Sequence, residues 1–255
     1  MMNTEKKENP ICALYPLTKL YLAAVLIAAA VLFPALPARI ACFACIHVLA
    51  WASGCYRAVV KRWAGTLGIL FLIILVVQTL FYPGEQVLFQ IWIFQAKREG
   101  LMLALKLGIL LLDVGGSLIW FFAITSEKAL VTALHKAGMS TDMTYILLST
   151  LQMVPVLKQK SAVIMNAQKA RGLETEGNVL VRARAFLPVL VPLVLSSLQG
   201  TEERALALEA RGFSVEGKKT HLFDIRPGKA DRVAAVLLTV LLLCMIAGRV
   251  ELWMA

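Results

Sequence analysis

The residues with the greatest capacity for chemistry are few and scattered along the chain. His47, His135 and His221 do not have the spacing of metal ligands, so no metal site is predicted. Cys42 and Cys45 have the spacing of a redox pair, but they lie inside the run ACFACIHVLAWAS, where cysteine is simply a small apolar residue. Because no nucleophile is paired with a base at a useful spacing, we predict a protein that is not an enzyme and needs no cofactor.

The stretch GFSVEGKK, residues 212–219, partly matches the motif of a phosphate-binding loop. Such loops carry Ser or Thr directly after the lysine and follow a strand, whereas this stretch follows a predicted helix and lacks the hydroxyl. Nucleotide binding by this chain itself is therefore not predicted.

One acidic residue, Asp113, lies within an apolar segment, and Lys106 precedes it by seven residues on the same helical stripe. Charged groups in lipid are costly and commonly mark function, so both are candidate intramembrane polar residues. In the favoured interpretation, Lys106 extends to the interface and Asp113 bonds a neighbouring helix. In the alternative, Asp113 is the coupling site of a stand-alone ion-coupled secondary transporter.

One polar phrase occurs twice in this apolar chain. AQKARGLETEG begins at Ala167, ALEARGFSVEG begins at Ala207, and six of their eleven positions are identical. Each copy has two alanines three residues apart, followed by Arg and Gly. These recurring positions, the candidate coupling residues, are Ala167, Ala170, Arg171 and Gly172 in the first copy and Ala207, Ala210, Arg211 and Gly212 in the second.

The residue types of the phrase indicate an exposed helix end that another protein can approach. Glycine just past a helix favours a left-handed cap, and paired alanines allow a second surface to come close. The protruding guanidinium group matches a carboxylate. Two such ends predict a partner that presents one socket twice, as two-fold assemblies do, and the paired nucleotide-binding subunits of ATP-driven transporters fit best.

The elements that must position these residues are membrane helices. Apolar residues make up 59% of the chain, which is above the usual range for soluble domains. The net charge of +10 is concentrated between apolar runs, which indicates cytoplasmic loops rather than a nucleic-acid surface. We predict an all-α polytopic protein of the cell membrane, built as a helical bundle with two long amphipathic cytoplasmic helices.

The apolar runs predict the positions of the spans. A basic cluster, Arg57, Lys61 and Arg62, follows the second run and is placed in the cytoplasm. The stretch VLFQIWIFQ after residue 86 is too short to span and is interpreted as interfacial or re-entrant. The predicted spans cover about residues 20–33, 40–56, 66–82, 101–124 and 233–248.

Charge divides the chain into three predicted regions. From Lys158 to Arg232, thirteen Lys or Arg stand against eight Asp or Glu. Within residues 127–232, two apolar helices are each followed by an amphipathic helix that ends in one copy of the phrase, with Pro155, Pro188 and Pro192 as expected kinks. The regions are N-terminal transmembrane helices (1–126), a cytoplasmic coupling region (127–232) and a C-terminal transmembrane helix (233–255).

From about residue 15 to 217, the chain resembles the transmembrane (T) component of energy-coupling factor transporters, a family that includes the cobalt and nickel permeases of that type. The two Ala-Arg-Gly phrases are the most specific part of this resemblance. Gln152 departs from the family's pattern, since the family often has a basic residue near that position. It is carried by YPLTKL, REGLMLALKL, TSEKALVTAL, QMVPVLKQKSAVIMNAQKARG and LPVLVPLVLSSLQGTEERALALEARGF.

The resemblance implies a non-catalytic scaffold of a prokaryotic cell membrane, with the coupling region in the cytoplasm. Its implied partners are two cytoplasmic ATP-binding subunits, a membrane-embedded substrate-binding subunit and the lipid bilayer, without nucleic acid. Carried over to this sequence, the coupling positions are residues 170–172 and 210–212. The implied function is transmission of ATP-driven motion for vitamin or metal-ion uptake.

Overall fold

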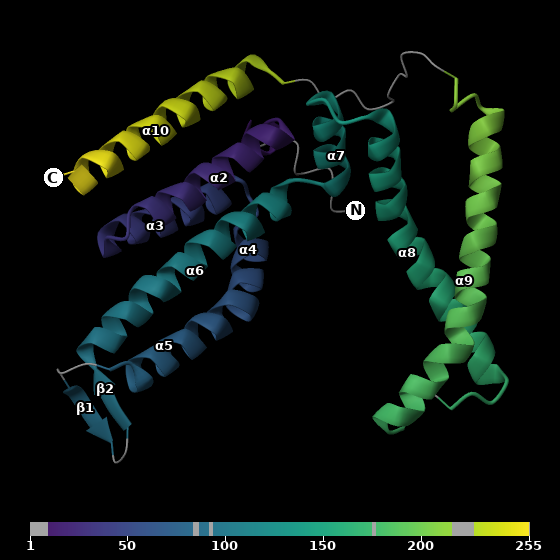
Figure 1. Cartoon of the computed structure of the whole chain (residues 1–255), viewed down its shortest axis with the longest axis horizontal. Helices are drawn as coiled ribbons and strands as arrows, with labels where there is room; N and C mark the ends of the chain where they lie inside the picture. Colours follow the sequence, from purple (N-terminus) through teal and green to yellow (C-terminus); the bar gives the residue numbers. More distant parts are fainter. Residues whose placement is uncertain (1–9, 84–86, 92–93, 175–176, 216–226, 255) are drawn as a thin grey trace. The chain divides into compact units, whose positions relative to one another are not determined.

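The computed structural model describes residues 10–83, 87–91, 94–174, 177–215 and 227–254, and most of them are helical (Figure 1). The protein is therefore an all-α polytopic membrane protein, as predicted, with one short β-hairpin. Two compact units are present. Residues 1–136 and 225–255 form the first unit, and residues 137–224 form the second.

The first unit begins with three helices: α1 (Pro10–Ala13), α2 (Pro16–Leu32) and α3 (Leu36–Ala52). A proline occupies the first turn of α2 and of α3, where the backbone N–H that proline lacks would have no helical partner. α2 ends two residues before Pro34, because the residue before a proline is disfavoured in the helical conformation. The helices predicted as the first two spans thus form and start about four residues early, but at 17 residues each they are shorter than the helices long enough to cross a membrane.

The third span is a continuous helix from Tyr56 to Phe81. It consists of α4 (Tyr56–Arg62), a π-helical segment (Trp63–Gly68) and α5 (Ile69–Phe81). The prediction started it near residue 66 and treated the basic cluster 57–62 as a loop. The structure places that cluster in the first turns of the helix, since long basic side chains at a span's end can reach the interface from helical positions.

The stretch after α5, which the sequence indicated as interfacial or re-entrant, forms an antiparallel hairpin. Strands β1 (Val87–Ile91) and β2 (Phe94–Lys97) pair Val87 with Lys97 and Ile91 with Phe94. The segment is too short to span a bilayer, as predicted. Pairing its two halves satisfies backbone groups that a short re-entrant piece would leave unbonded.

Helix α6 (Arg98–Ile124) is the centre of the first unit. It packs against α2, α3 and α5, while α7 (Glu127–Lys136) and α10 (Lys229–Met254) pack on α2. Trp120 and Phe121 of α6 are among the most deeply buried side chains. The helix that carries Asp113 is therefore surrounded by protein over much of its length.

Small residues bring α5 and α6 close together. A Cβ atom on Gly108 would lie 2.5 Å from the ring of Phe71, and one on Gly100 would lie 2.4 Å from the carbonyl oxygen of Gln78. Gly100, Ala104 and Gly108 stand four residues apart, the spacing that lets membrane helices approach one another. A larger residue at Gly108 would push the two helices apart.

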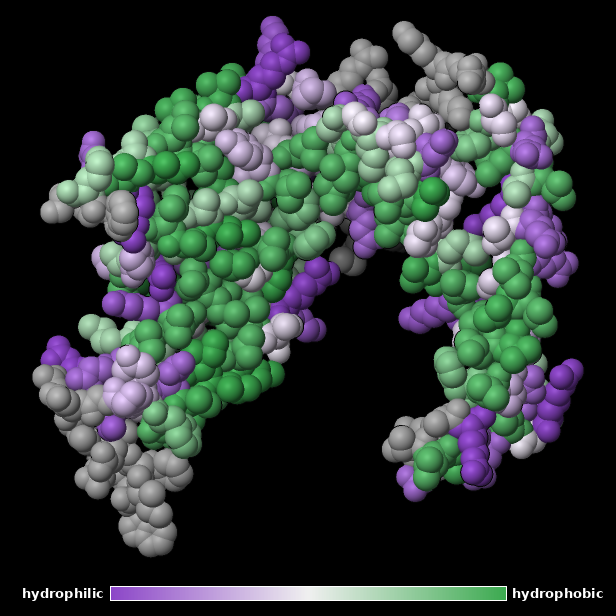
Figure 2. Space-filling model, viewed as in Figure 1, coloured by the Kyte–Doolittle hydropathy of each residue, from purple (hydrophilic) through white to green (hydrophobic). Residues whose placement is uncertain are grey.

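Among the described residues, four helices are long and apolar enough to cross a membrane: Tyr56–Phe81, Arg98–Ile124, Arg184–Ala210 and Lys229–Glu251. The apolar helices α2 and α3 are shorter. The apolar window of the Tyr56–Phe81 helix has no buried residue, and Figure 2 shows apolar side chains over the helices of the first unit. Exposed apolar faces of this kind suit contact with lipid. The protein is a multi-pass protein of the cell membrane.

The second unit contains two long helices, α8 (Thr141–Ala170) and α9 (Val179–Ala210). The Ser140 hydroxyl caps α8 by accepting from the backbone N–H of Met143 at 3.3 Å. Each helix is continuous, whereas the sequence predicted an apolar helix followed by a separate amphipathic one. Prolines inside both helices bend the ribbon without ending it, most visibly in the first part of α9 (Figure 1).

The two compact units divide the chain after residues 136 and 224, while the predicted regions divide it after 126 and 232. Helix α7, expected in the coupling region, belongs to the first unit. The predicted regions separate transmembrane from cytoplasmic parts of the chain. Compact units do not show which parts lie in the membrane, so these regions stay a prediction.

Candidate coupling site

Both copies of the repeated phrase end their helices in the same way. α8 ends at Ala170 with Gly172 at φ +87°, and α9 ends at Ala210 with Gly212 at φ +73°. Only glycine adopts such positive φ angles without strain. The left-handed glycine caps predicted from the sequence are confirmed. We call residues 167–173 the first tip and residues 207–213 the second tip.

The backbone hydrogen bonds at the two tips are equivalent. At the first tip, the Gly172 N–H donates to the Lys169 carbonyl at 2.9 Å and the Leu173 N–H to the Gln168 carbonyl at 3.0 Å. Gly212 and Phe213 repeat both bonds forty residues later, to the carbonyls of Glu209 and Leu208 at 2.9 and 3.0 Å. These two backbone hydrogen bonds together form the Schellman cap. The backbone next to each arginine therefore has the same hydrogen-bonding pattern.

The two tips are exposed. The alanines at 167, 170, 207 and 210, both arginines and Gly172 are exposed, and Gly212 is half-buried. Within the described part of the chain, no acidic side chain forms an ion pair with Arg171 or Arg211. Each tip therefore offers a flat surface of small side chains beside one uncompensated guanidinium group.

Helices α8 and α9 run antiparallel, so the tips lie at opposite ends of one helix pair (Figure 1). Phe213 of the second tip packs its ring on Tyr145, near the start of α8, with ring centroids 5.0 Å apart. Gln168 of the first tip donates from Nε2 to the carbonyl of Pro188, in the first part of α9, at 3.3 Å. With a rise of about 1.5 Å per residue, the tips are on the order of 40 Å apart.

A polar bond holds the middle of this helix pair. The ammonium group of Lys160 donates to the hydroxyl of Ser196 at 3.0 Å and lies near its backbone carbonyl at 3.4 Å. Lys160 also approaches Gly200, where an added Cβ would lie 3.8 Å from the ammonium nitrogen. The pair is thus tied near both ends and in the middle, which favours movement of both tips as one body.

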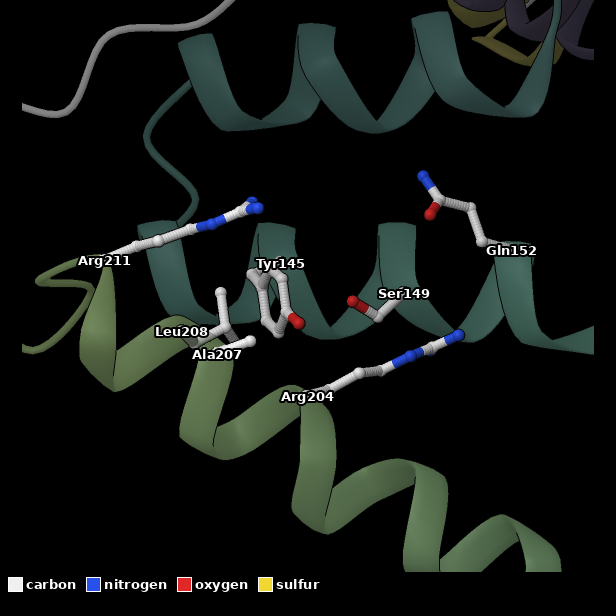
Figure 3. A pocket seen from close by; sticks show the side chains of 7 residues that line it. All are labelled: Tyr145, Ser149, Gln152, Arg204, Ala207, Leu208 and Arg211. Atoms are coloured by element: carbon white, nitrogen blue, oxygen red, sulfur yellow. The ribbon is translucent and has the colours of Figure 1, made fainter.

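A pocket of about 340 Å³ opens beside the second tip, between the start of α8 and the end of α9. The guanidinium groups of Arg204 and Arg211 extend from α9 toward α8 (Figure 3). The lining residues are Tyr145, Ser149, Gln152, Arg204, Ala207, Leu208 and Arg211.

Sequence reasoning identified Ala207 and Arg211 of this pocket but missed Tyr145, Ser149 and Arg204. One signal was present, because Arg204 precedes Arg211 by seven residues and lies on the same helical stripe. The contribution of α8 had no sequence signal, since it depends on how the two helices pair.

The structure separates the two intramembrane polar candidates of α6. Asp113 is completely buried, and neither carboxylate oxygen has a hydrogen-bond partner among the described residues. Lys106 is exposed, and its side chain does not pair with Asp113. The bond from Asp113 to a neighbouring helix that the sequence suggested is thus absent from this part of the chain.

A buried arginine near Asp113 was also missed. Arg39 of α3 donates from Nε to the carbonyl of Ala30 in α2 at 3.3 Å, and from Nη1 to the carbonyl of Lys106 in α6. It therefore ties three helices together. Its sequence signal was weak because it stands between Pro37 and Ile40, where an interfacial arginine is ordinary.

The remaining reactive residues do not gather into a site within the described ranges. No group of three His, Cys, Asp or Glu side chains there is placed to hold a metal ion. The thiols of Cys42 and Cys45 are free. His221 and residues 216–219 of the GFSVEGKK stretch lie outside the described residues.

Comparison with known proteins gives a consistent result. The family described as CbiQ, cobalt transport protein, matches residues 7–222. An energy-coupling factor transporter transmembrane protein, EcfT, of Leuconostoc gelidum is 31% identical over 204 residues, covering 72% of this chain and 76% of the relative. EcfT proteins of Acidaminococcus fermentans (30% identity, 69% and 68% coverage) and Lactococcus lactis (29% identity, 68% and 70% coverage) are similarly close.

Proposed function

Because this chain belongs to the CbiQ family and is the transmembrane component of an energy-coupling factor transporter, we propose that it is a scaffold that couples two ATP-binding subunits to a substrate-binding membrane subunit. The first tip docks on one cytoplasmic ATP-binding subunit and the second tip on the other. Closure of these subunits on ATP moves the α8/α9 pair, and the membrane helices pass that motion on for vitamin or metal-ion uptake.

The observation that carries this proposal is the equivalence of two exposed, capped tips at opposite ends of one helix pair. A dimeric partner presents the same patch twice, and two copies of one cap fit two copies of one socket. The tips are separated on the order of 40 Å, so each can reach a different subunit.

The chemistry of the tips supports docking on carboxylates. Arg171 and Arg211 are exposed and have no acidic partner within the described chain. Arginine binds a carboxylate through two parallel hydrogen bonds, which fixes orientation as well as affinity. The adjacent alanines let the socket wall approach the helix backbone.

The same proposal assigns no catalysis to this chain. The similar proteins are named as transmembrane proteins of a transporter, and ATP hydrolysis belongs to the docked subunits. The cytoplasmic location of the tips and the number of docked subunits are parts of the proposal.

Charge reversal tests the docking. In the Arg171→Glu, Arg211→Glu double variant, each carboxylate of the ATP-binding subunits meets a like charge at a buried contact. The repulsion makes the binding free energy less favourable by about 2 to 5 kcal/mol per site. We expect the solubilised complex to lose both ATP-binding subunits and cells to lose uptake. Lys158→Glu is the control, since Lys158 is an exposed basic residue of α8 outside both tips. Retention of the subunits by the double variant at wild-type levels would refute the docking assignment.

A second candidate function, ion-coupled secondary transport, is favoured by one observation. Asp113 is buried in α6, and its two carboxylate oxygens have no hydrogen-bond partner in the described ranges, as expected of a cation- or proton-binding carboxylate in a transporter. Asp113→Asn separates the two functions. The scaffold requires only a modest change in uptake, about twofold, because removing a charge does not alter the tips. A secondary transporter would lose uptake completely and would not need ATP.

A further inference from the structure

The pocket beside the second tip is lined by groups that donate hydrogen bonds. Arg204 and Arg211 carry fixed positive charge, Gln152 offers an amide, and Ser149 and Tyr145 offer hydroxyl groups. No carboxylate is among its lining residues. A site with this lining favours an anion with planar oxygen atoms.

The positive charge of the pocket is not compensated within the described chain. Arg204 Nη1 contacts the thioether sulfur of Met153, which is only a weak acceptor. The three acidic residues of the last turns of α9, Glu202, Glu203 and Glu209, are exposed and do not line the pocket. Both guanidinium groups are thus available to a ligand.

The size and position of the pocket fit a side chain of a docked protein. Its volume of about 340 Å³ compares with roughly 30 Å³ for one water molecule, so a side chain and a few waters can enter. Arg211 belongs both to the second tip and to the pocket lining (Figure 3). A protein seated on the tip is therefore already next to the pocket.

The first copy of the phrase has no counterpart of the second guanidinium group. The residue that corresponds to Arg204, seven positions before the tip arginine, is Ile164. Leu208 of the pocket corresponds to Gln168, which instead bonds the Pro188 carbonyl. In these two copies, a second guanidinium group lies beside the second tip alone, whereas the first tip carries Lys169 next to the residues of its cap.

We infer that this pocket binds an acidic side chain of the ATP-binding subunit docked on the second tip, held by Arg204 together with Arg211. The inference rests on the proposed function and adds to it a second arginine–carboxylate pair, because the first copy has Ile164 where the second has Arg204. The second tip, with Arg204 beside it, therefore selects the subunit whose socket carries an additional carboxylate.

Removal of the second guanidinium group tests this site. The Arg204→Ile variant gives the second copy the residue of the first, and we expect the ATP-binding subunit to bind the solubilised chain about tenfold more weakly. Lys158→Ile is the matched control for loss of an exposed basic residue and should change affinity by less than about twofold. Equal affinities for the Arg204→Ile variant and the wild type would overturn the inference.

Cross-linking identifies the group in the pocket. An Arg204→Lys variant places a primary amine there, and a carbodiimide joins an amine to a carboxylate only when they are in contact. We expect a cross-link to an Asp or Glu of the ATP-binding subunit, located by mass spectrometry. Arg211→Lys serves as the companion variant at the tip itself.

The two variants distinguish failure of this inference from failure of the proposed function. A cross-link from the Arg211→Lys variant but none from Arg204→Lys would overturn the pocket assignment and leave docking intact. Absence of ATP-binding subunits from the wild-type complex would overturn both. If Arg204→Ile instead releases bound phosphatidylglycerol without changing subunit affinity, the pocket is a lipid headgroup site and the inference is wrong.

Discussion

The two tips have the same backbone and different surroundings. Both end in a Schellman cap with bonds of 2.9 and 3.0 Å, and both expose one arginine. The first tip carries Lys169 just before its arginine, whereas the second carries Glu209 at the same place and Arg204 two turns earlier. The cap and the arginine, which both tips share, fit a docking site common to the two ATP-binding subunits. The neighbouring charged residues, which differ, distinguish the docking site of one subunit from that of the other.

The tips also differ in how they are held. Phe213 of the second tip packs its ring on Tyr145 of α8, while Gln168 of the first tip donates a hydrogen bond from its side-chain amide to the backbone carbonyl of Pro188. The second tip thus contacts the opposite helix through an aromatic ring and the first tip through a polar side chain. Predictions that treat the tips separately test whether this difference matters for function.

The largest effect is expected from single charge reversals. Arg171→Glu and Arg211→Glu should each weaken binding of an ATP-binding subunit by at least about a hundredfold, because a like charge replaces a buried ion pair. Titration of each solubilised variant with purified subunits gives the two affinities. If one reversal has no effect, that tip does not dock and the comparison between the tips fails.

An intermediate effect is expected from the cap glycines. A β-branched residue in the left-handed region costs about 1 to 2 kcal/mol, so Gly172→Val and Gly212→Val should each weaken docking about tenfold by misdirecting the adjacent arginine. Gly200→Ala, inside α9, is the control, because an added Cβ there makes only ordinary van der Waals contact with the Lys160 ammonium nitrogen at 3.8 Å. Because both glycines have positive φ angles, the two losses should agree within about threefold, and a loss at only one of them would show that the caps are not equivalent in function.

The smallest effect is expected from the anchor of the second tip. Phe213→Leu removes a ring pair worth about 0.5 to 1.5 kcal/mol and should slightly weaken docking at the second tip, by about threefold. Phe186→Leu, at an exposed position of α9, should leave docking unchanged. Titration of each solubilised variant with purified ATP-binding subunits, as for the single charge reversals, gives the two affinities to be compared. Equal affinities for both variants would show that the ring contact does not position the tip.

Much of the fold was predictable because apolar runs and helix-ending residues are local signals. The membrane character, the helical class and the glycine caps at residues 172 and 212 follow from hydropathy and from the conformational freedom of glycine. The helix boundaries were less accurate at Tyr56, where a basic first turn resembles a loop. They were also less accurate in α8 and α9, where the change from an apolar to an amphipathic stretch suggested two helices in place of one continuous helix.

By itself, the sequence determined that two equivalent arginine tips exist, because a cap requires only a few neighbouring residues. The tertiary structure decided where they lie, since the antiparallel pairing of α8 and α9 sends them to opposite ends and brings Tyr145 of one helix beside Arg204 and Arg211 of the other. It also decided that Asp113 is buried, with no hydrogen-bond partner among the residues that the structure describes, while Lys106 is exposed. Helical spacing gives the stripe on which a residue lies, but only packing decides what faces that stripe.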